Sequence, residues 1–213
     1  MISDEEILKT YARYMLSIKS RLQAVAKLSL AGLDAKYIVE ESIALQLRMI
    51  IEAMYMSSLC ANAQKFAETW KGYRKTKDIR EIKKRLKGHE WWPEPIVSAR
   101  DKILVLKDQK FPEQTANETF WKCGAICHHS PMFGRGTLPS TDELNEMFDM
   151  FEAVTLGIRE QLRRHRVEIN LDGDHATMVE CDMLFENGDG EVAVQLVHAE
   201  KQKRISQMFP IDV

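Results

Sequence analysis

The chain has 213 residues, of which 45% are hydrophobic and 29% charged, a balance typical of a folded protein and not of a disordered one. Its net charge of −2 excludes a protein that attracts nucleic acid or membrane as a whole, so such binding would need a local patch. The N-terminus has no basic start followed by an apolar run, which excludes a typical signal peptide. The scattered cysteines indicate reduced thiols in the cytoplasm: Cys60, Cys123, Cys127 and Cys181.

The first predicted helix begins at a capping-box pattern. Ser3 can cap the helix and Glu6 stands three residues later. Apolar residues then recur at spacings of three and four, and Gly32 ends the pattern. We therefore expect one core-facing side, formed by Ile7, Leu8, Tyr11, Tyr14, Met15, Ile18, Leu22, Val25 and Leu28.

A second helix is predicted from near Asp34 to about Trp70, because no Gly or Pro interrupts it. Its middle is apolar on almost every side, which is typical of a central helix packed by several neighbours. Arg48 and Glu52 lie inside its longest apolar stretch. A membrane-spanning helix rarely carries two charges at its centre, so we expect a buried helix of a soluble protein.

Residues 71–87 are strongly basic and predict a surface helix, followed by Trp91 and Trp92 in an extended loop. Cations beside aromatic rings are the components of a platform for single-stranded nucleic acid. The alternative is a solvated helix face with no ligand. If RNA binds, the expected contacts are Lys75, Arg80 and Lys84, together with Arg163 and Arg164 further along the chain.

The second half of the chain predicts two more helices and then strands. Residues 96–112 fit a short helix or a short strand at 103–106, and a helix follows over roughly 113–129. Ser140 or Thr141 caps a long helix that ends near Arg166. Its expected core face consists of Leu144, Met147, Phe148, Phe151, Val154, Leu156, Ile158 and Leu162.

After Arg166 the hydrophobic period changes from helical to two, with a strong hairpin turn at residues 187–190. This pattern predicts three strands. The expected fold is mainly α (α+β), with a helical bundle over residues 1–166 and a C-terminal three-stranded antiparallel β meander over residues 167–213 packed on it.

Cys123 and Cys127 lie one helical turn apart and precede His128 and His129, which suggests a metal site. Three residues separate the two cysteines, whereas a strong zinc motif has two between them. The chain also has no second pair of ligands with a matching spacing. Buried packing of the cysteines is the simpler alternative, and we expect no metal or other cofactor. The His pair together with Arg135 is a rival location for an Arg/His active site.

Arg159 and His165 define the main catalytic hypothesis. Both are predicted at the end of the long helix, where their side chains could converge. A neutral imidazole can take a proton from a ribose 2′-hydroxyl, and a guanidinium can hold the phosphate. The pair would allow RNA cleavage without a metal. The alternative is that Arg and His at a helix C-terminus only complement its dipole.

A helical core with this Arg-x5-His element resembles the HEPN superfamily (higher eukaryotes and prokaryotes nucleotide-binding). The run from Arg48 to Asn62 is also similar to the central helix of bacterial proteins of that type. The resemblance implies Arg159 and His165 as site residues, and a homodimer that brings two motifs to one cleft. Glu160 follows the Arg here, where the family commonly has a small polar residue, often Asn.

Three functional hypotheses follow, the third being a metal-binding protein that uses Cys123, Cys127 and His128, and the sequence does not decide whether the protein is an enzyme. The first is a cytoplasmic, metal-independent HEPN-like ribonuclease, a hydrolase of a bacterial defence or toxin–antitoxin system, with RNA as its partner. The alternative is a non-catalytic helical interaction or regulatory protein that dimerises or binds a protein partner. No membrane partner is expected in either case.

Overall fold

The computed structural model describes residues 3–30, 36–62, 80, 81, 84, 92–99, 102–106, 110–127, 140–171, 175–185, 191–198 and 203–210. Within them the helices are α1 (Asp4–Leu30), α2 (Lys36–Ala61), α5 (Glu113–Cys127) and α6 (Thr141–Leu162). The strands are β1 (Glu94–Ala99), β2 (Lys102–Val105), β3 (Arg164–Leu171), β4 (His175–Asp182), β5 (Glu191–His198) and β6 (Lys203–Pro210). The predicted mainly helical α+β class is confirmed.

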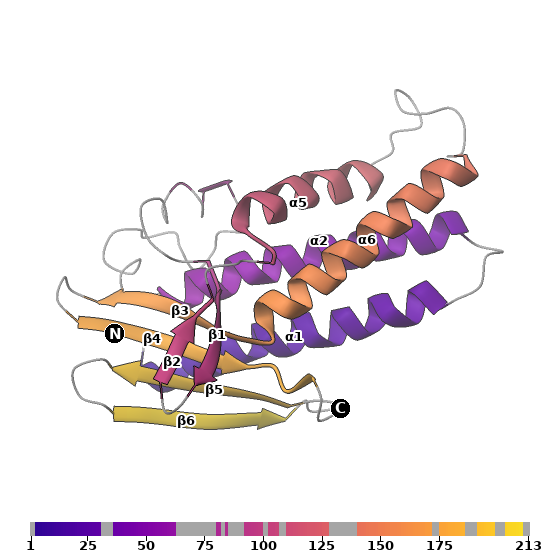
Figure 1. Cartoon of the computed structure of the whole chain (residues 1–213). Coiled ribbons are helices and arrows are strands. Elements are labelled where there is room, and N and C mark those ends of the chain that lie inside the picture. Colours follow the sequence, from indigo (N-terminus) through magenta and orange to yellow (C-terminus); the bar gives the residue numbers. More distant parts are fainter. Residues whose placement is uncertain are drawn as a thin grey trace.

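Helix α2 is the central element of the helical layer. It packs along α1 and against α5 and α6 (Figure 1). By length and composition the stretch Ile38–Ala61 could cross a membrane, but 61% of its most apolar window is buried against the rest of the chain. The predicted burial of this helix is thus confirmed. The helix is shorter than predicted, because Asn62 forms a turn and its side chain donates to the Ser58 carbonyl at 2.9 Å.

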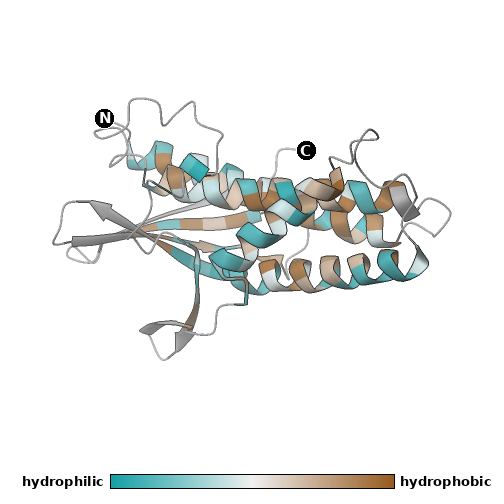
Figure 2. Cartoon of the chain, turned by 90° about the horizontal axis from the view of Figure 1, so that it is seen from above, coloured by the Kyte–Doolittle hydropathy of each residue, from teal (hydrophilic) through white to brown (hydrophobic). Residues whose placement is uncertain are grey.

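The amphipathic patterns of α1 and α6 place their apolar sides in the core. Hydrophobic and hydrophilic residues alternate along the helices in Figure 2, as expected for helices with one buried face. In α1 most of the predicted face between Ile7 and Val25 is buried, while Tyr14 and Leu28 are half-buried against the core. The capping box of α6 is also confirmed: the Glu143 amide donates to Ser140 Oγ, and the Ser140 amide donates to the Glu143 carboxylate at 2.8 Å.

The sheet has more strands than the sequence indicated. Its order is β2-β1-β3-β4-β5-β6, and each neighbouring pair is antiparallel. The predicted three-stranded meander has a fourth strand, β6, and β3 begins at Arg164 instead of residue 167. The β1–β2 hairpin covers residues 94–105, within and just before the range 96–112 that the sequence left ambiguous, and it joins β3 at Glu94 and Pro95. An ion pair between Arg166 and Glu94, 3.0 Å long, reinforces this junction.

A buried glutamine attaches the hairpin to the helical layer. Gln161, near the end of α6, donates its amide to the Pro93 carbonyl at 2.6 Å and accepts from the Phe111 amide at 3.0 Å. Trp92 donates its indole N–H to the Phe111 carbonyl at 2.9 Å. The segments on both sides of the hairpin therefore meet α6 at one point. Gly157 permits this approach, since a Cβ there would lie 3.0 Å from the Lys110 carbonyl oxygen.

We expect Gln161→Leu to lower the free energy of unfolding by about 3 kcal/mol, because it leaves a buried carbonyl and a buried amide without partners. Urea unfolding followed by circular dichroism measures the loss. Glu160→Leu is the matched control: its side chain is exposed, and we expect a change within about 0.5 kcal/mol. Equal losses in the two variants would show that the Gln161 bridge does not anchor the hairpin.

Candidate functional site

The structure separates Arg159 and His165 into different elements. Helix α6 ends at Leu162, and His165 is the second residue of β3. The prediction that both residues share one helix end is therefore wrong. The cause is long-range pairing, because His165 lies opposite Cys181 of β4 on one side and Pro95 of β1 on the other.

His165 is fully buried, and both of its ring nitrogens have partners. Nδ1 lies 2.9 Å from the Leu162 carbonyl oxygen, which can only accept, so Nδ1 carries the proton. Nε2 then accepts from the Tyr11 hydroxyl at 2.7 Å. Burial lowers the pKa of His165 to about 4, so the ring is neutral at pH 7. In this structure the ring of His165 is therefore enclosed, and both of its nitrogens are engaged by groups of the chain itself.

Arg159 lies outside this buried cluster. It is exposed on α6, with its guanidinium carbon 5.2 Å from the centre of the Phe185 ring. The same ring lies 6.0 Å from the ammonium of Lys19, which is buried and donates to the carbonyls of Leu184 and Glu191. Phe185 thus links α1 and α6 to the residues that follow β4. Arg159 and His165 are not brought to one cleft.

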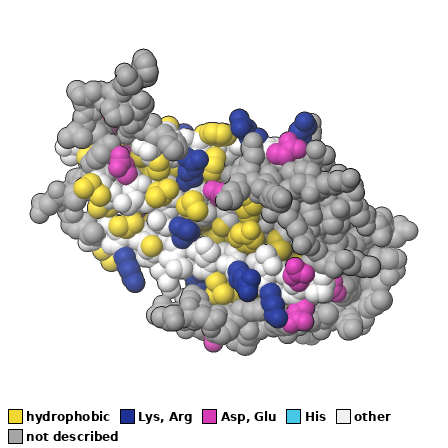
Figure 3. All heavy atoms as spheres, turned by 180° about the vertical axis from the view of Figure 1, so that it is seen from behind, with side chains coloured by type: hydrophobic (Ala, Val, Ile, Leu, Met, Phe, Trp, Pro, Cys, Tyr) yellow, Lys and Arg dark blue, Asp and Glu magenta, His cyan; other side chains and the backbone are white. Residues whose placement is uncertain are grey.

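The predicted RNA contacts are spread over several parts of the chain. Lys75 lies outside the described residues, whereas Arg80 and Lys84 have helical backbone and are exposed. Arg163 is exposed and Arg164 is half-buried at the start of β3. On the face shown in Figure 3, the described Lys and Arg side chains are interspersed with hydrophobic ones and form no continuous basic patch there. RNA binding stays a prediction.

The cysteine pair lies against the core. Cys123 is buried, and the half-buried Cys127 donates its thiol to the Glu41 carbonyl of α2 at 3.9 Å. Burial raises the pKa of Cys123 to about 12 and also raises the pKa of Cys127, which disfavours the thiolates that bind metals. Among the described residues no group of three or more His, Cys, Asp or Glu could hold a metal. His128, His129 and Arg135 lie outside them.

The described chain has an open groove that runs along the helical layer, from the end that lies away from the sheet to Arg159 near the sheet. Helices α1 and α6 both pack on α2 but have little direct contact with each other, and they diverge with distance from the sheet (Figure 1). Between them lies a pocket of about 610 Å³. We call it the α1/α6 groove. It is lined by Val25, Ala26 and Ser29 of α1, Val39 of α2, and residues between Asn145 and Arg159 of α6.

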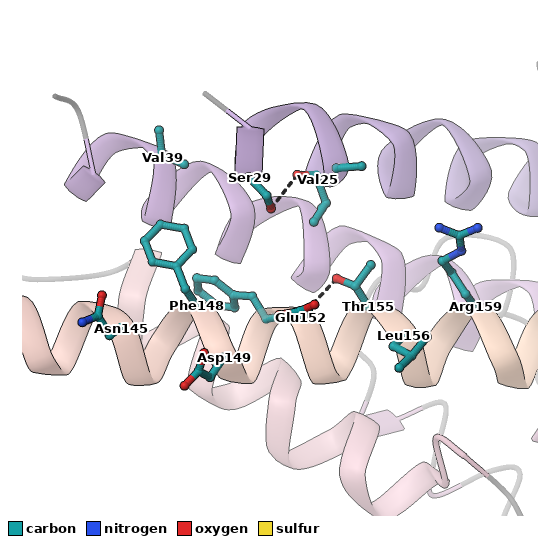
Figure 4. A pocket seen from close by; sticks show the side chains of 12 residues that line it. Val25, Ser29, Val39, Asn145, Phe148, Asp149, Glu152, Thr155, Leu156 and Arg159 are labelled. Carbon is teal, nitrogen blue, oxygen red and sulfur yellow. Dashed lines mark hydrogen bonds between the residues drawn. The ribbon is translucent and has the colours of Figure 1, made fainter. Parts of the chain in front are cut away.

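The interior of the α1/α6 groove is apolar and its rim is charged. Val25 and Phe151 are buried in it, and Phe148 is half-buried. Phe148 and Arg159 project from α6 toward α1 and α2, while Asp149 and Leu156 lie along the exposed edge of α6 (Figure 4). The groove therefore offers an apolar surface bordered by charges of both signs.

Sequence reasoning missed this groove and misplaced one of its residues. Leu156 was expected in the core, but its side chain is 60% exposed. A signal was present, since residues 145, 148, 149, 152, 155, 156 and 159 fall on one continuous side of a helix. Periodicity defines such a side but does not show whether the rest of the chain covers it.

Comparisons with known proteins do not assign a family: no protein-family model, no curated protein and no solved structure matches the chain.

We expect folding stability to fall between pH 6.5 and 4 because of His165. The unfolded chain binds a proton on this residue below its ordinary pKa of 6.5, whereas the folded protein binds it only near pH 4. In that window the unfolded state therefore holds more protons, and acid favours it. The full contribution is on the order of 3 kcal/mol.

Urea unfolding of wild type and His165→Gln from pH 7 to pH 4 isolates this effect. Glutamine does not titrate, so the stability advantage of wild type should shrink by about 3 kcal/mol across the window. Parallel pH profiles would contradict the buried, neutral state of His165.

Proposed function

We propose that this chain is a non-catalytic interaction protein that binds a segment of a partner protein in the α1/α6 groove. The observation that carries the proposal is Leu156, a large apolar side chain that is 60% exposed and lines the same open pocket as the half-buried Phe148. An exposed apolar surface in a concave site commonly marks a binding site. Its burial by a partner would supply the main driving force for association.

The surroundings of His165 favour this function over the ribonuclease hypothesis. A general base must come within hydrogen-bond distance of the proton it takes, and the His165 ring is enclosed and engaged by Tyr11 and Leu162. Its lowered pKa also makes it a weak base at neutral pH. HEPN-like activity would need this buried cluster to open, and the HEPN resemblance stays a prediction.

A site-specific photo-crosslinker tests the groove as the binding surface. We expect p-benzoylphenylalanine at position 156 to form an adduct with a discrete protein in lysate of the source cells. The same probe at position 106 is the control, because Leu106 is also an exposed leucine (42%) but follows β2 and does not line the groove. Mass spectrometry identifies the adduct. Equal labelling at both positions, or none at 156, would contradict a partner-binding groove.

A cleavage assay on labelled RNA tests the absence of catalysis. We expect no specific cleavage by the purified protein, either in excess chelator or with added Mg²⁺. Arg159→Ala is the better variant for comparison, because Arg159 is exposed and its loss should leave the fold intact. Cleavage by wild type that disappears in Arg159→Ala would overturn the interaction proposal and restore the ribonuclease hypothesis.

A further inference from the structure

We infer that the occupant of the α1/α6 groove is an amphipathic helix that carries basic residues facing Asp149 and Glu152 and an acidic residue facing Arg159. This inference rests on the proposed function and specifies the chemistry of the partner.

The shape of the groove suits a helix of about four turns. The lining of α6 runs from Asn145 to Arg159, about 21 Å at roughly 1.5 Å per residue. On the opposite rim, α1 presents Ala26 and Ser29. Because these side chains are small, the backbone of an incoming helix can approach α1 closely while its larger apolar residues reach Phe148.

The backbone chemistry of the walls favours a helix over an extended peptide. The groove is formed by α1, α2 and α6, whose interior N–H and C=O groups are used within the helices. No strand edge lines it among the described residues, so an extended peptide would find no ladder to join. A helix satisfies its own backbone groups and can bury one apolar face in the groove.

The charges on the rim specify the partner further. Asp149 and Glu152 lie three positions apart, one turn along α6, and both are exposed. Within the described part of the chain, neither forms an ion pair, and Arg159 forms no ion pair but places its guanidinium over the Phe185 ring. Asp142, Glu143 and Glu146 add exposed carboxylates at the same end of α6. The resulting negative potential attracts a basic segment and disfavours an acidic one.

The spacing of these charges fixes a pattern in the partner. Arg159 lies seven residues beyond Glu152, two turns or about 10 Å along α6. A partner helix lying along α6 should therefore carry Lys or Arg at one end and Asp or Glu about two turns away. Its apolar residues should recur at spacings of three and four between them.

Selection from a displayed library of random 16-residue peptides tests this pattern without assuming a sequence. We expect the peptides enriched on wild type to be amphipathic helices with basic residues about two turns from an acidic one. They should lose at least tenfold in affinity for Leu156→Asp. Selection on Asp149→Lys/Glu152→Lys should enrich acidic residues in place of the basic ones. Leu106→Asp is the control and should bind the selected peptides as wild type does.

The outcomes separate this inference from the proposed function. Peptides that depend on Leu156 but show no basic preference, or bind as extended chains by circular dichroism, overturn the inference and leave the groove as a binding site. Peptides that bind Leu156→Asp as tightly as wild type overturn both. The remaining alternative is that a second copy of this chain occupies the α1/α6 groove. A wild-type dimer that Leu156→Asp dissociates in analytical ultracentrifugation would overturn the basic helix as partner.

Discussion

The hydrogen bonds of His165 hold together the parts of this protein that come from opposite ends of the sequence. Tyr11 belongs to α1, Leu162 ends α6, and His165 itself begins the meander as part of β3. An imidazole excluded from water and kept neutral satisfies a phenol on one side and a helix-terminal carbonyl on the other. Without it, both groups would lose a hydrogen-bond partner in the buried junction, and a buried polar group left unsatisfied costs about 1–3 kcal/mol. The junction of helices and sheet depends on this pair of bonds.

A second set of interactions connects α1 and α6 near the same junction. Lys19 of α1 and Arg159 of α6 both face the ring of Phe185, and Lys19 also binds two carbonyls beside it. Helices α1 and α6 are therefore connected at one end through the residues that follow β4, although they contact each other little. Toward the other end the two helices diverge, and the α1/α6 groove opens between them. Arg159 belongs to both regions, since it contacts the Phe185 ring and also lines the α1/α6 groove, which extends from there along α6 to Asn145.

Local signals in the sequence were sufficient to predict where the helices lie. They were insufficient to predict the full sheet and the candidate binding site. Spacings of three and four correctly gave the buried side of α1, and the capping box correctly gave the start of α6. The end of α6 was misjudged because Arg163, Arg164 and His165 fit a helix locally. Pairing with β4 and β1, residues distant in sequence, makes His165 part of a strand. Residues 96–112, which contain most of the hairpin, were ambiguous for the same reason, since the hairpin's anchors at Gln161 and β3 are distant in sequence too.

The preferred function changed from RNA cleavage to partner binding because of which side chains are buried, and not because of which residue types are present. Arg159 and His165 have the chemistry that RNA cleavage requires, yet the fold uses one as a buried bridge and leaves the other at the rim of a groove. Leu156 is the converse case, an apolar residue that looked structural and is exposed. Periodicity reports that a helix has an apolar side, but whether that side meets the core or a partner depends on how far neighbouring helices extend and diverge. In α6 both situations occur on one helix. Its inner side packs on α2, and its adjacent side borders the groove on a rigid element, where side chains can be held ready for a partner.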